Sequence, residues 1–244
     1  MKITKATLYT DNIEQMKQFY LKTLGFSQVS ETDRSFAIQA GASVLEFELD
    51  PLRTPKQYHY AFNIPGNLFI EAKKWIKNHI SLLLHEEEDE IFFENTNSHS
   101  VYFYDSDENV VELIARHAVN PTRPSSLFVA RDILDIGEMN LTTDDVLGVG
   151  EKLEEIGVFQ RYGSPLKGDS LNFLGEPQDG THILLGPAGR NWLFSKKDAI
   201  TSPIMIELNH QHRIQVDSSG KMQHELLATK PLESAFKRSH GKIL

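Results

Sequence analysis

The sequence predicts an α+β fold built from repeated modules of one strand, one helix and three further strands. Residues 3–49 and 58–115 both follow this order, and each closes on an apolar run with a central glutamate, Glu46 in the first and Glu112 in the second. A weaker third copy runs from about residue 134 to residue 208. An internal repeat indicates architecture more strongly than any single residue does, so these copies carry the prediction.

In the first module, residues 3–9 alternate as a strand, which places Lys5 and Tyr9 on the face opposite the apolar residues. Apolar residues at helical spacing then predict a helix over 13–24, and Gly25 supplies a left-handed stop. Three short strands complete the module, over residues 26–31, 34–40 and 42–49. In the last of these strands, Glu46 and Glu48 share the face opposite the leucines and the phenylalanine.

The second module repeats this pattern. Residues 58–64 alternate, with His59 and Asn63 on one face and the larger apolar side chains on the other. A helix follows over about 68–79, after the turn residues Pro65 and Gly66. Three further strands are predicted over residues 91–94, 100–104 and 110–115, and the last contains Glu112.

The third module begins after a linker at residues 118–130. It is predicted as a strand over 134–141, a helix over 144–156 and strands near 158–161, 169–174, 181–185 and 203–208. Glu138 and Glu207 occupy the places that Lys5 and Glu46 hold in the first module. We expect module boundaries at 131 and 210, followed by a basic C-terminal tail over 211–244.

One such module alone would leave an unpaired strand edge and an open apolar face. We therefore expect a homodimer in which the third module pairs with its copy. At the positions that correspond to Lys5 and Glu46, the third module has Glu138 and Glu207 and no histidine, so we do not assign it a metal site.

Composition and charge exclude several classes of protein. The chain has no cysteine, which leaves His, Asp and Glu as the strong metal ligands. A formal net charge of −9 argues against nucleic acid or an anionic membrane as a partner. Neither a signal peptide nor a long apolar segment is visible, so we expect a cytoplasmic protein without a membrane partner.

Two motifs resemble the vicinal oxygen chelate superfamily, the group of glyoxalase I, fosfomycin-resistance proteins, bleomycin resistance proteins and extradiol dioxygenases. The run Asn12-Ile-Glu-Gln-Met-Lys-Gln-Phe-Tyr-Leu-Lys-Thr-Leu-Gly-Phe26 resembles its first helix. The run Val101-Tyr-Phe-Tyr-Asp-Ser-Asp-Glu-Asn-Val-Val-Glu-Leu113 resembles its closing hairpin, with Glu108 where a glycine is usual. The resemblance implies that residues 1–117 form a domain of two paired modules. Their strands would form curved mixed sheets around one cleft, which in the family usually holds a divalent metal.

Matched to the family, Lys5, Glu46, His59 and Glu112 fall at the positions that carry its ligands. The resemblance therefore implies a metal site of Glu46, His59 and Glu112, with Lys5 or Glu48 as a proton carrier. One imidazole and two carboxylates suit Fe, Mn, Zn or Ni with positions open for substrate. Such a metal acts as a Lewis acid that holds two neighbouring oxygens of a small-molecule substrate.

Lys5 departs from this pattern, because the family commonly has histidine at its position and a protonated ammonium cannot ligate a metal. Lys5 is equally able to replace a metal through an ion pair with Glu46 or Glu112. Two classes of function therefore follow. The first is a metal-dependent lyase or dioxygenase of the glyoxalase and dioxygenase kind, and the second is a metal-free protein that binds a small antibiotic-like or aromatic molecule.

Further residues are candidates for lining the cleft. They are Tyr9, Asn63, His99, Phe103 and Arg116. Core packing or surface pairing explains Tyr9, Asn63, Phe103 and Arg116 equally well. The alternative for His99 is an ordinary histidine in the loop before the closing hairpin. No nucleophile elbow, phosphate loop or dinucleotide fingerprint is present, which argues against covalent hydrolysis.

Overall fold

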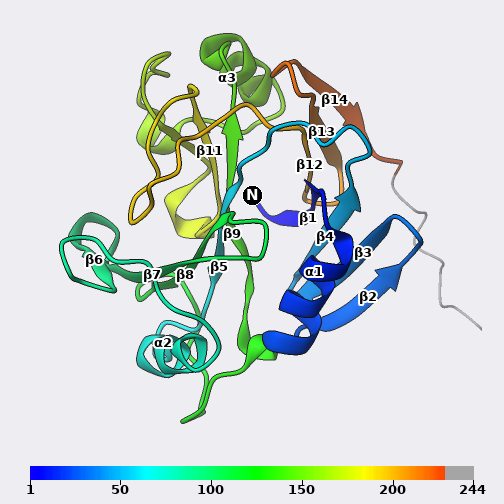
Figure 1. Cartoon of the computed structure of the whole chain (residues 1–244). Helices are drawn as coiled ribbons and strands as arrows, with labels where there is room; N and C mark the ends of the chain where they lie inside the picture. Colours follow the sequence, from blue (N-terminus) through cyan, green and yellow to red (C-terminus); the bar gives the residue numbers. More distant parts are fainter. Residues whose placement is uncertain (229–244) are drawn as a thin grey trace, which may run out of the picture.

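Residues 1–228 of the computed structural model form one strongly curved sheet of fourteen strands with three α-helices packed against it (Figure 1). The main path of the sheet runs β14-β13-β12-β1-β9-β5-β8-β7-β6. Strands β4, β3 and β2 branch from β1, and strands β11 and β10 branch from β9. This mixed α+β architecture of repeated modules confirms the predicted fold class.

The first module has the predicted order. Its elements are β1 (Ile3–Thr10), α1 (Ile13–Lys17), a π-helical turn at Gln18–Thr23, β2 (Ser27–Glu31), β3 (Ser35–Ala40) and β4 (Ser43–Leu49). Strand β4 lies parallel to β1, and β3 and β2 follow it antiparallel. The side chain of Asn12 accepts a hydrogen bond from the backbone N–H of Gln15 and so caps the helix.

The second module repeats this connectivity. It consists of β5 (His59–Asn63), α2 (Phe69–Lys77), β6 (Ile91–Phe93), β7 (Ser98–Tyr104) and β8 (Val110–Arg116). Strand β8 is parallel to β5, and β7 and β6 continue antiparallel. The repeat seen in the sequence is thus a repeat of strand order as well.

The third module is shorter than predicted. It contains β9 (Asp135–Thr142), α3 (Val146–Glu155), β10 (Asn172–Leu174) and β11 (His182–Gly186), with β11 parallel to β9. The stretch predicted as a strand near 158–161 makes only an isolated bridge from Gln160 to Leu174. The last predicted strand, β12 (Ile204–Leu208), leaves this module and pairs with β1.

Residues 211–228 also differ from the expected tail, because they form β13 (His212–Val216) and β14 (Met222–Leu226). These strands extend β12 as an antiparallel meander. Ile214, Val216 and Met222 are buried between polar neighbours, and Gly220 adopts a φ of +79° at the turn. The rest of the expected tail, residues 229–244, lies outside the described residues.

The modules pair differently from the expectation. Strand β5 lies antiparallel to β9, so the second module shares its cleft with the third. Strand β1 lies antiparallel to β12, so the meander of β12–β14 completes the first module. Between these halves, β1 and β9 share only the residue pair Ile3 and Ile136. The third module therefore has a partner within its own chain, which removes the reason for expecting a dimer.

One hydrophobic core runs through both halves. It joins aromatic side chains of the first module, such as Tyr20 and Phe47, to Phe62, Met139 and Leu153 of the other two. Continuous burial of this kind fixes the relative position of the modules. Within residues 1–228, no helix is long and apolar enough to cross a membrane.

Candidate metal centre

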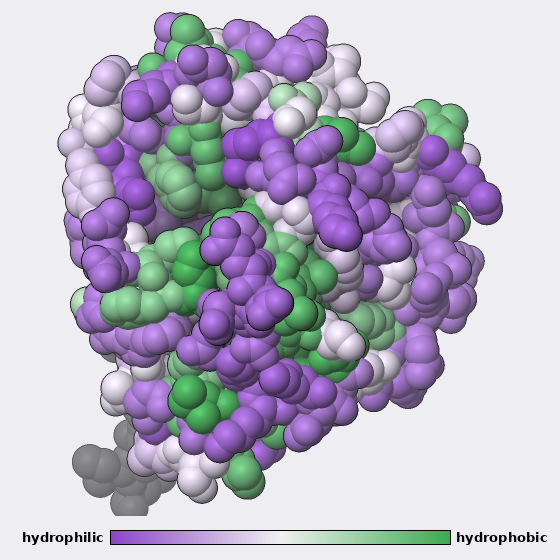
Figure 2. All heavy atoms as spheres, turned by 60° about the vertical axis from the view of Figure 1, so that its left-hand side comes forward, coloured by the Kyte–Doolittle hydropathy of each residue, from purple (hydrophilic) through white to green (hydrophobic). Residues whose placement is uncertain are grey.

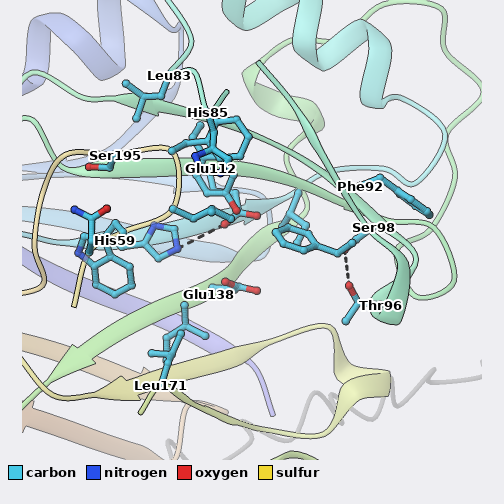
Figure 3. A pocket seen from close by; sticks show the side chains of 18 of the residues that line it. His59, Leu83, His85, Phe92, Thr96, Ser98, Glu112, Glu138, Leu171 and Ser195 are labelled. Carbon is cyan, nitrogen blue, oxygen red and sulfur yellow. Dashed lines mark hydrogen bonds and ion pairs between the residues drawn. The ribbon is translucent and has the colours of Figure 1, made fainter. Parts of the chain in front are cut away.

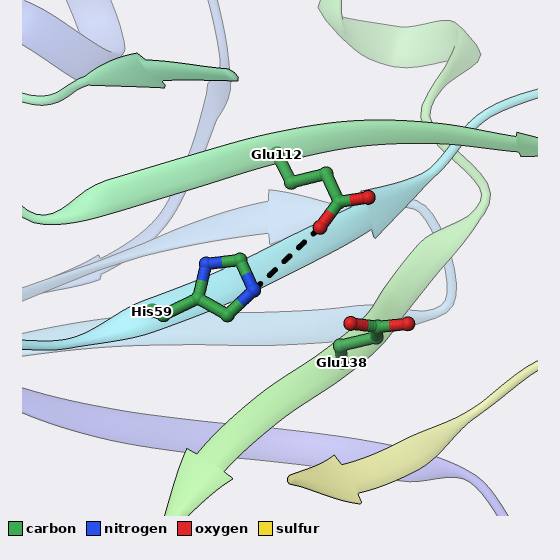
Figure 4. Close-up of side chains that lie close together, drawn as sticks. All are labelled: His59, Glu112 and Glu138. Atoms are coloured by element: carbon green, nitrogen blue, oxygen red, sulfur yellow. Dashed lines mark ion pairs between the residues drawn. The ribbon is translucent and has the colours of Figure 1, made fainter. Parts of the chain in front are cut away.

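Three ligand-type side chains converge in the half of the molecule made by the second and third modules. His59 comes from β5, Glu112 from β8 and Glu138 from β9 (Figure 4). One possible ligand atom of each lies within 4.8 Å of the others, and all three side chains are buried.

Sheet register explains why they meet. Ala61 in β5 is the register partner of Glu112 on one side and of Glu138 on the other. Since side chains alternate along a strand, His59, two residues before Ala61, points to the same face as both carboxylates. Three neighbouring strands therefore bring together residues that are far apart in the sequence.

The imidazole of His59 is oriented for ligation. Its Nδ1 lies 3.0 Å from the carbonyl oxygen of Val110, which only a protonated Nδ1 can satisfy. The lone pair of Nε2 then faces the carboxylates, with Glu112 Oε2 at 3.5 Å. Burial lowers the pKa of His59 and so favours the neutral ring that a metal requires.

The two carboxylates are not equivalent. Burial alone would raise the pKa of Glu138, but the guanidinium of Arg116 donates to its Oε1 and holds that pKa below the ordinary value. Burial and the charge of Glu138 raise the pKa of Glu112 well above the ordinary value, which favours the neutral acid when no cation is bound.

These residues fit a divalent transition metal. One neutral imidazole and two carboxylates form a donor set used for Fe, Mn, Zn and Ni. Metal–ligand bonds of roughly 2.0–2.2 Å keep ligand atoms within about 4.4 Å of one another, so a small approach of the carboxylates closes the observed spread of 4.8 Å. Arg116 contacts only Oε1 of Glu138, and ligation requires Glu112 in its ionised form.

A large cavity opens over the three residues. It has a volume of about 1200 Å³, and Figure 3 shows His59, Glu112 and Glu138 side by side on its wall. Figure 2 shows a recess in this face of the molecule with hydrophobic side chains around it. The size is sufficient for a drug-sized organic ligand.

Aromatic side chains form one wall of the cavity. The rings of Trp192 and His59 lie 4.8 Å apart, and those of Tyr102 and Phe194 are stacked at 4.9 Å. Trp192 and Phe194 belong to the connection between β11 and β12, where the Ser195 hydroxyl lies 2.9 Å from that of Tyr104. This connection therefore screens the carboxylates from water on one side.

The structure brings only two of the predicted ligands together, His59 and Glu112. Glu46 lies in the other half of the molecule, where its Oε2 is 2.8 Å from Lys5 Nζ and accepts a hydrogen bond from Thr7 at 2.9 Å. The physical reason is the pairing of β1 with β12 rather than with β5. Lys5 thus pairs with Glu46, as one alternative expected, but away from His59.

All but one of the remaining candidates lie away from the wall of the cavity. Tyr9 and Glu48 are register partners on β1 and β4, in the first module. Asn63 donates to Asp135 and to the carbonyl of Gly180, and Phe103 is part of the hydrophobic core. His99 Nδ1 lies 2.7 Å from His117 Nε2. Arg116, by contrast, lines the cavity and pairs with Glu138.

Sequence reasoning did not identify Glu138 as a candidate ligand. Its position matches that of Lys5 in the repeat, but the third module by itself has no histidine at a matching position. Glu138 becomes a candidate only when the second module is taken as the partner of the third. The pairing of β9 with β5 then places His59 on the neighbouring strand. Tyr102 was missed because its neighbour Phe103 was chosen, and alternation sends these two side chains to opposite faces.

Comparisons with known proteins support the overall fold. A family model described as "Toxoflavin-degrading enzyme" matches residues 136–190, which include Glu138. A putative dioxygenase from Bacillus subtilis is structurally similar with a TM-score of 0.57 and 15% identity, covering 92% of this chain and 84% of that one. A search of curated proteins found no match.

Two further solved structures match less than half of this chain. A lactoylglutathione lyase from Agrobacterium tumefaciens has a TM-score of 0.37 and 21% identity over 46% of this chain and 90% of that one. A mutant fosfomycin resistance protein, FosX, from Listeria monocytogenes, solved with Mn(II) and a dihydroxypropylphosphonic acid, has a TM-score of 0.36 and 19% identity over 47% of this chain and 89% of that one.

Proposed function

Since the chain has the vicinal oxygen chelate fold, we propose that it is a metal-dependent enzyme acting on a small molecule with two adjacent oxygens. His59, Glu112 and Glu138 would hold the metal. The observation that carries the proposal is their convergence from three strands at the wall of a large cavity. The match to a toxoflavin-degrading family over residues 136–190 supports a degradative reaction of the glyoxalase or dioxygenase kind.

When bound, the metal would supply Lewis acidity toward neighbouring substrate oxygens. The protein's own residues have separate tasks. His59 offers Nε2 because Nδ1 is committed to Val110. Arg116 keeps Glu138 ionised and in place, and the aromatic wall of Tyr102 and Trp192 excludes water from one side.

Metal content tests the proposal most simply. Protein purified without a chelator is expected to contain about one equivalent of Fe, Mn, Zn or Ni by elemental analysis. His59→Ala and Glu112→Ala should both lose it, because each removes one ligand. Glu48→Ala is the matched control, since Glu48 lies in the first module and should leave the metal content unchanged. Metal-free wild-type protein that stays metal-free in the presence of each ion would refute the proposal.

One observation favours a second candidate function. The Arg116–Glu138 ion pair balances one carboxylate of the site without a cation, and the raised pKa of Glu112 favours the neutral form of the other. The cavity would then bind a small molecule by shape, as expected for a metal-free resistance protein. Tight ligand binding by metal-free protein with no turnover in the presence of added metal would favour this candidate.

The cleft is complete within one chain, because β5 and β9 pair directly. A homodimer is therefore not required for the proposed activity. Light scattering at micromolar concentration measures the mass in solution, and activity at concentrations where the protein is monomeric would show that a single chain suffices.

A further inference from the structure

The wall of the cavity carries both charge signs. Its cationic side chains are Arg116, Arg161, Arg190 and Lys196, and its carboxylates are Glu86, Glu94, Glu112 and Glu138. Arg116 is neutralised by Glu138. Within residues 1–228, Arg190 makes no ion pair with a carboxylate.

The guanidinium of Arg190 is held in one orientation but is incompletely hydrogen-bonded. Its carbon lies 4.1 Å from the centroid of the Trp192 ring, a cation–π contact. Nη1 donates to the carbonyl of Asn191 at 3.3 Å, whereas Nε and Nη2 are buried and have no partner among the described residues. Burial accordingly lowers the pKa of Arg190, as expected for a cation without a counter-ion.

Trp192 adds a third unsatisfied donor next to the two of Arg190. Its side chain is only 3% exposed, and its Nε1 also has no hydrogen-bond partner within residues 1–228. Its ring contacts that of His59 at a centroid distance of 4.8 Å. Buried donors without partners are unfavourable, so a cluster of them beside a ligand cavity indicates a missing acceptor.

We propose that Arg190 and Trp192 Nε1 form a subsite for an oxyanion carried by the substrate, a carboxylate or a phosphonate. The planar guanidinium suits such a group because its free N–H donors match two oxygens of one anion. Its role as part of a substrate site rests on the proposed function. The affinity for an oxyanion depends only on the geometry of Arg190 and Trp192.

Binding of three small probes to the metal-free full chain tests this subsite. Benzoate and phenylphosphonate carry an oxyanion, benzamide is the neutral counterpart of benzoate, and none has adjacent hydroxyl oxygens to hold a metal. We expect titration calorimetry to show at least one anion bound about tenfold more tightly than benzamide, as for a charge-assisted hydrogen bond. The tighter of the two anions identifies the preferred oxyanion.

Variants then locate the effect. Arg190→Gln should abolish the preference for the anion and leave benzamide binding unchanged, and Trp192→Phe should weaken the preference while keeping the ring. Arg161→Gln is the matched control, because Arg161 lines the same cavity but stacks on Phe173 instead. Circular dichroism and thermal unfolding confirm that each variant is folded.

An equal affinity of wild-type protein for anion and amide would overturn the assignment, as would an anion preference that survives in Arg190→Gln or that is lost in Arg161→Gln alone. No metal is present in this binding assay. A protein that binds no metal in the metal-content experiment would therefore refute the proposed function, while the preference for the anion would stand.

Discussion

Arg116→Met tests the electrostatic account of the site in depth. Arg116 and Glu138 are both nearly fully buried, with side chains 5% and 8% exposed. Removing the guanidinium leaves a buried carboxylate beside Glu112 without its counter-ion. Breaking a buried pair in this way costs about 3–5 kcal/mol of unfolding free energy. Methionine keeps much of the volume of the side chain, so the loss reports the charge rather than a cavity.

Urea denaturation of metal-free protein measures this cost. A double-mutant cycle with Glu138→Gln isolates the interaction, because the double variant should recover much of the stability lost in Arg116→Met. Arg213→Met is the control, since its pair with Glu207 is more exposed, at 35% and 15%, and should contribute at most about 1 kcal/mol.

A metal should rescue the same variant. A divalent cation between the carboxylates supplies the positive charge that Arg116→Met lacks, so adding Mn(II) should raise the stability of the variant more than that of the wild type. An Arg116→Met variant as stable as Arg213→Met, or one that Mn(II) fails to stabilise, would refute this reading of the site.

Two other predictions concern residues outside the cavity. The carboxylate of Asp50 is buried, yet hydrogen bonds from Thr54 and from backbone N–H groups hold its pKa well below the ordinary value for an aspartate. A lowered folded-state pKa stabilises the protein above about pH 4, and this effect is lost progressively as the pH falls toward the folded-state pKa. Asp50→Asn should therefore be less stable than wild type at pH 7, by a difference that becomes clearly smaller at about pH 2 in denaturant titrations. A constant difference between the two proteins at both pH values would contradict this. Gly41 has a φ of +60°, and a Cβ there would lie 2.0 Å from the carbonyl oxygen of Leu134. Gly41→Ala should therefore lower the thermal midpoint far more than Gly157→Ala, where φ is +82° but no atom lies within 4 Å; equal losses would show that backbone strain alone matters.

Much of the fold was predictable because each module encodes its own elements. Alternating residues define β1 and β5, and capping and glycine residues place α1 within a few positions of its observed bounds. The order of strands within a module follows from a right-handed crossover between parallel strands. These features are local, and a repeated sequence makes them visible twice.

The partner of each module was not predictable in the same way. The first strand of every module has an apolar face and two edges that can form hydrogen bonds. The alternation of residues therefore does not predict which strand of another module pairs with it. Strand β12 resembled the end of the third module, but it pairs with β1 and is followed by β13 and β14. This exchange moves Glu46 away from His59 and brings Glu138 in its place.

Two of the three candidate ligands followed from the sequence. His59 and Glu112 belong to the same module, in which β5 and β8 are parallel neighbours, and their alternation together with the family resemblance placed them on one face. The third ligand and the aromatic wall of Trp192 come from outside that module. Their position depends on tertiary pairing, which composition and periodicity do not encode.

The central claim is that the second and third modules together hold the metal. A comparison of Mn(II) affinity between the Glu138→Ala and Glu46→Ala variants tests it most directly. Mn(II) binding to metal-free protein, followed by electron paramagnetic resonance, should show a loss of affinity of more than about 100-fold in Glu138→Ala. Glu46→Ala, which breaks the pair with Lys5 in the other half, should bind Mn(II) like the wild type. The reverse result, with affinity lost in Glu46→Ala and kept in Glu138→Ala, would contradict the account.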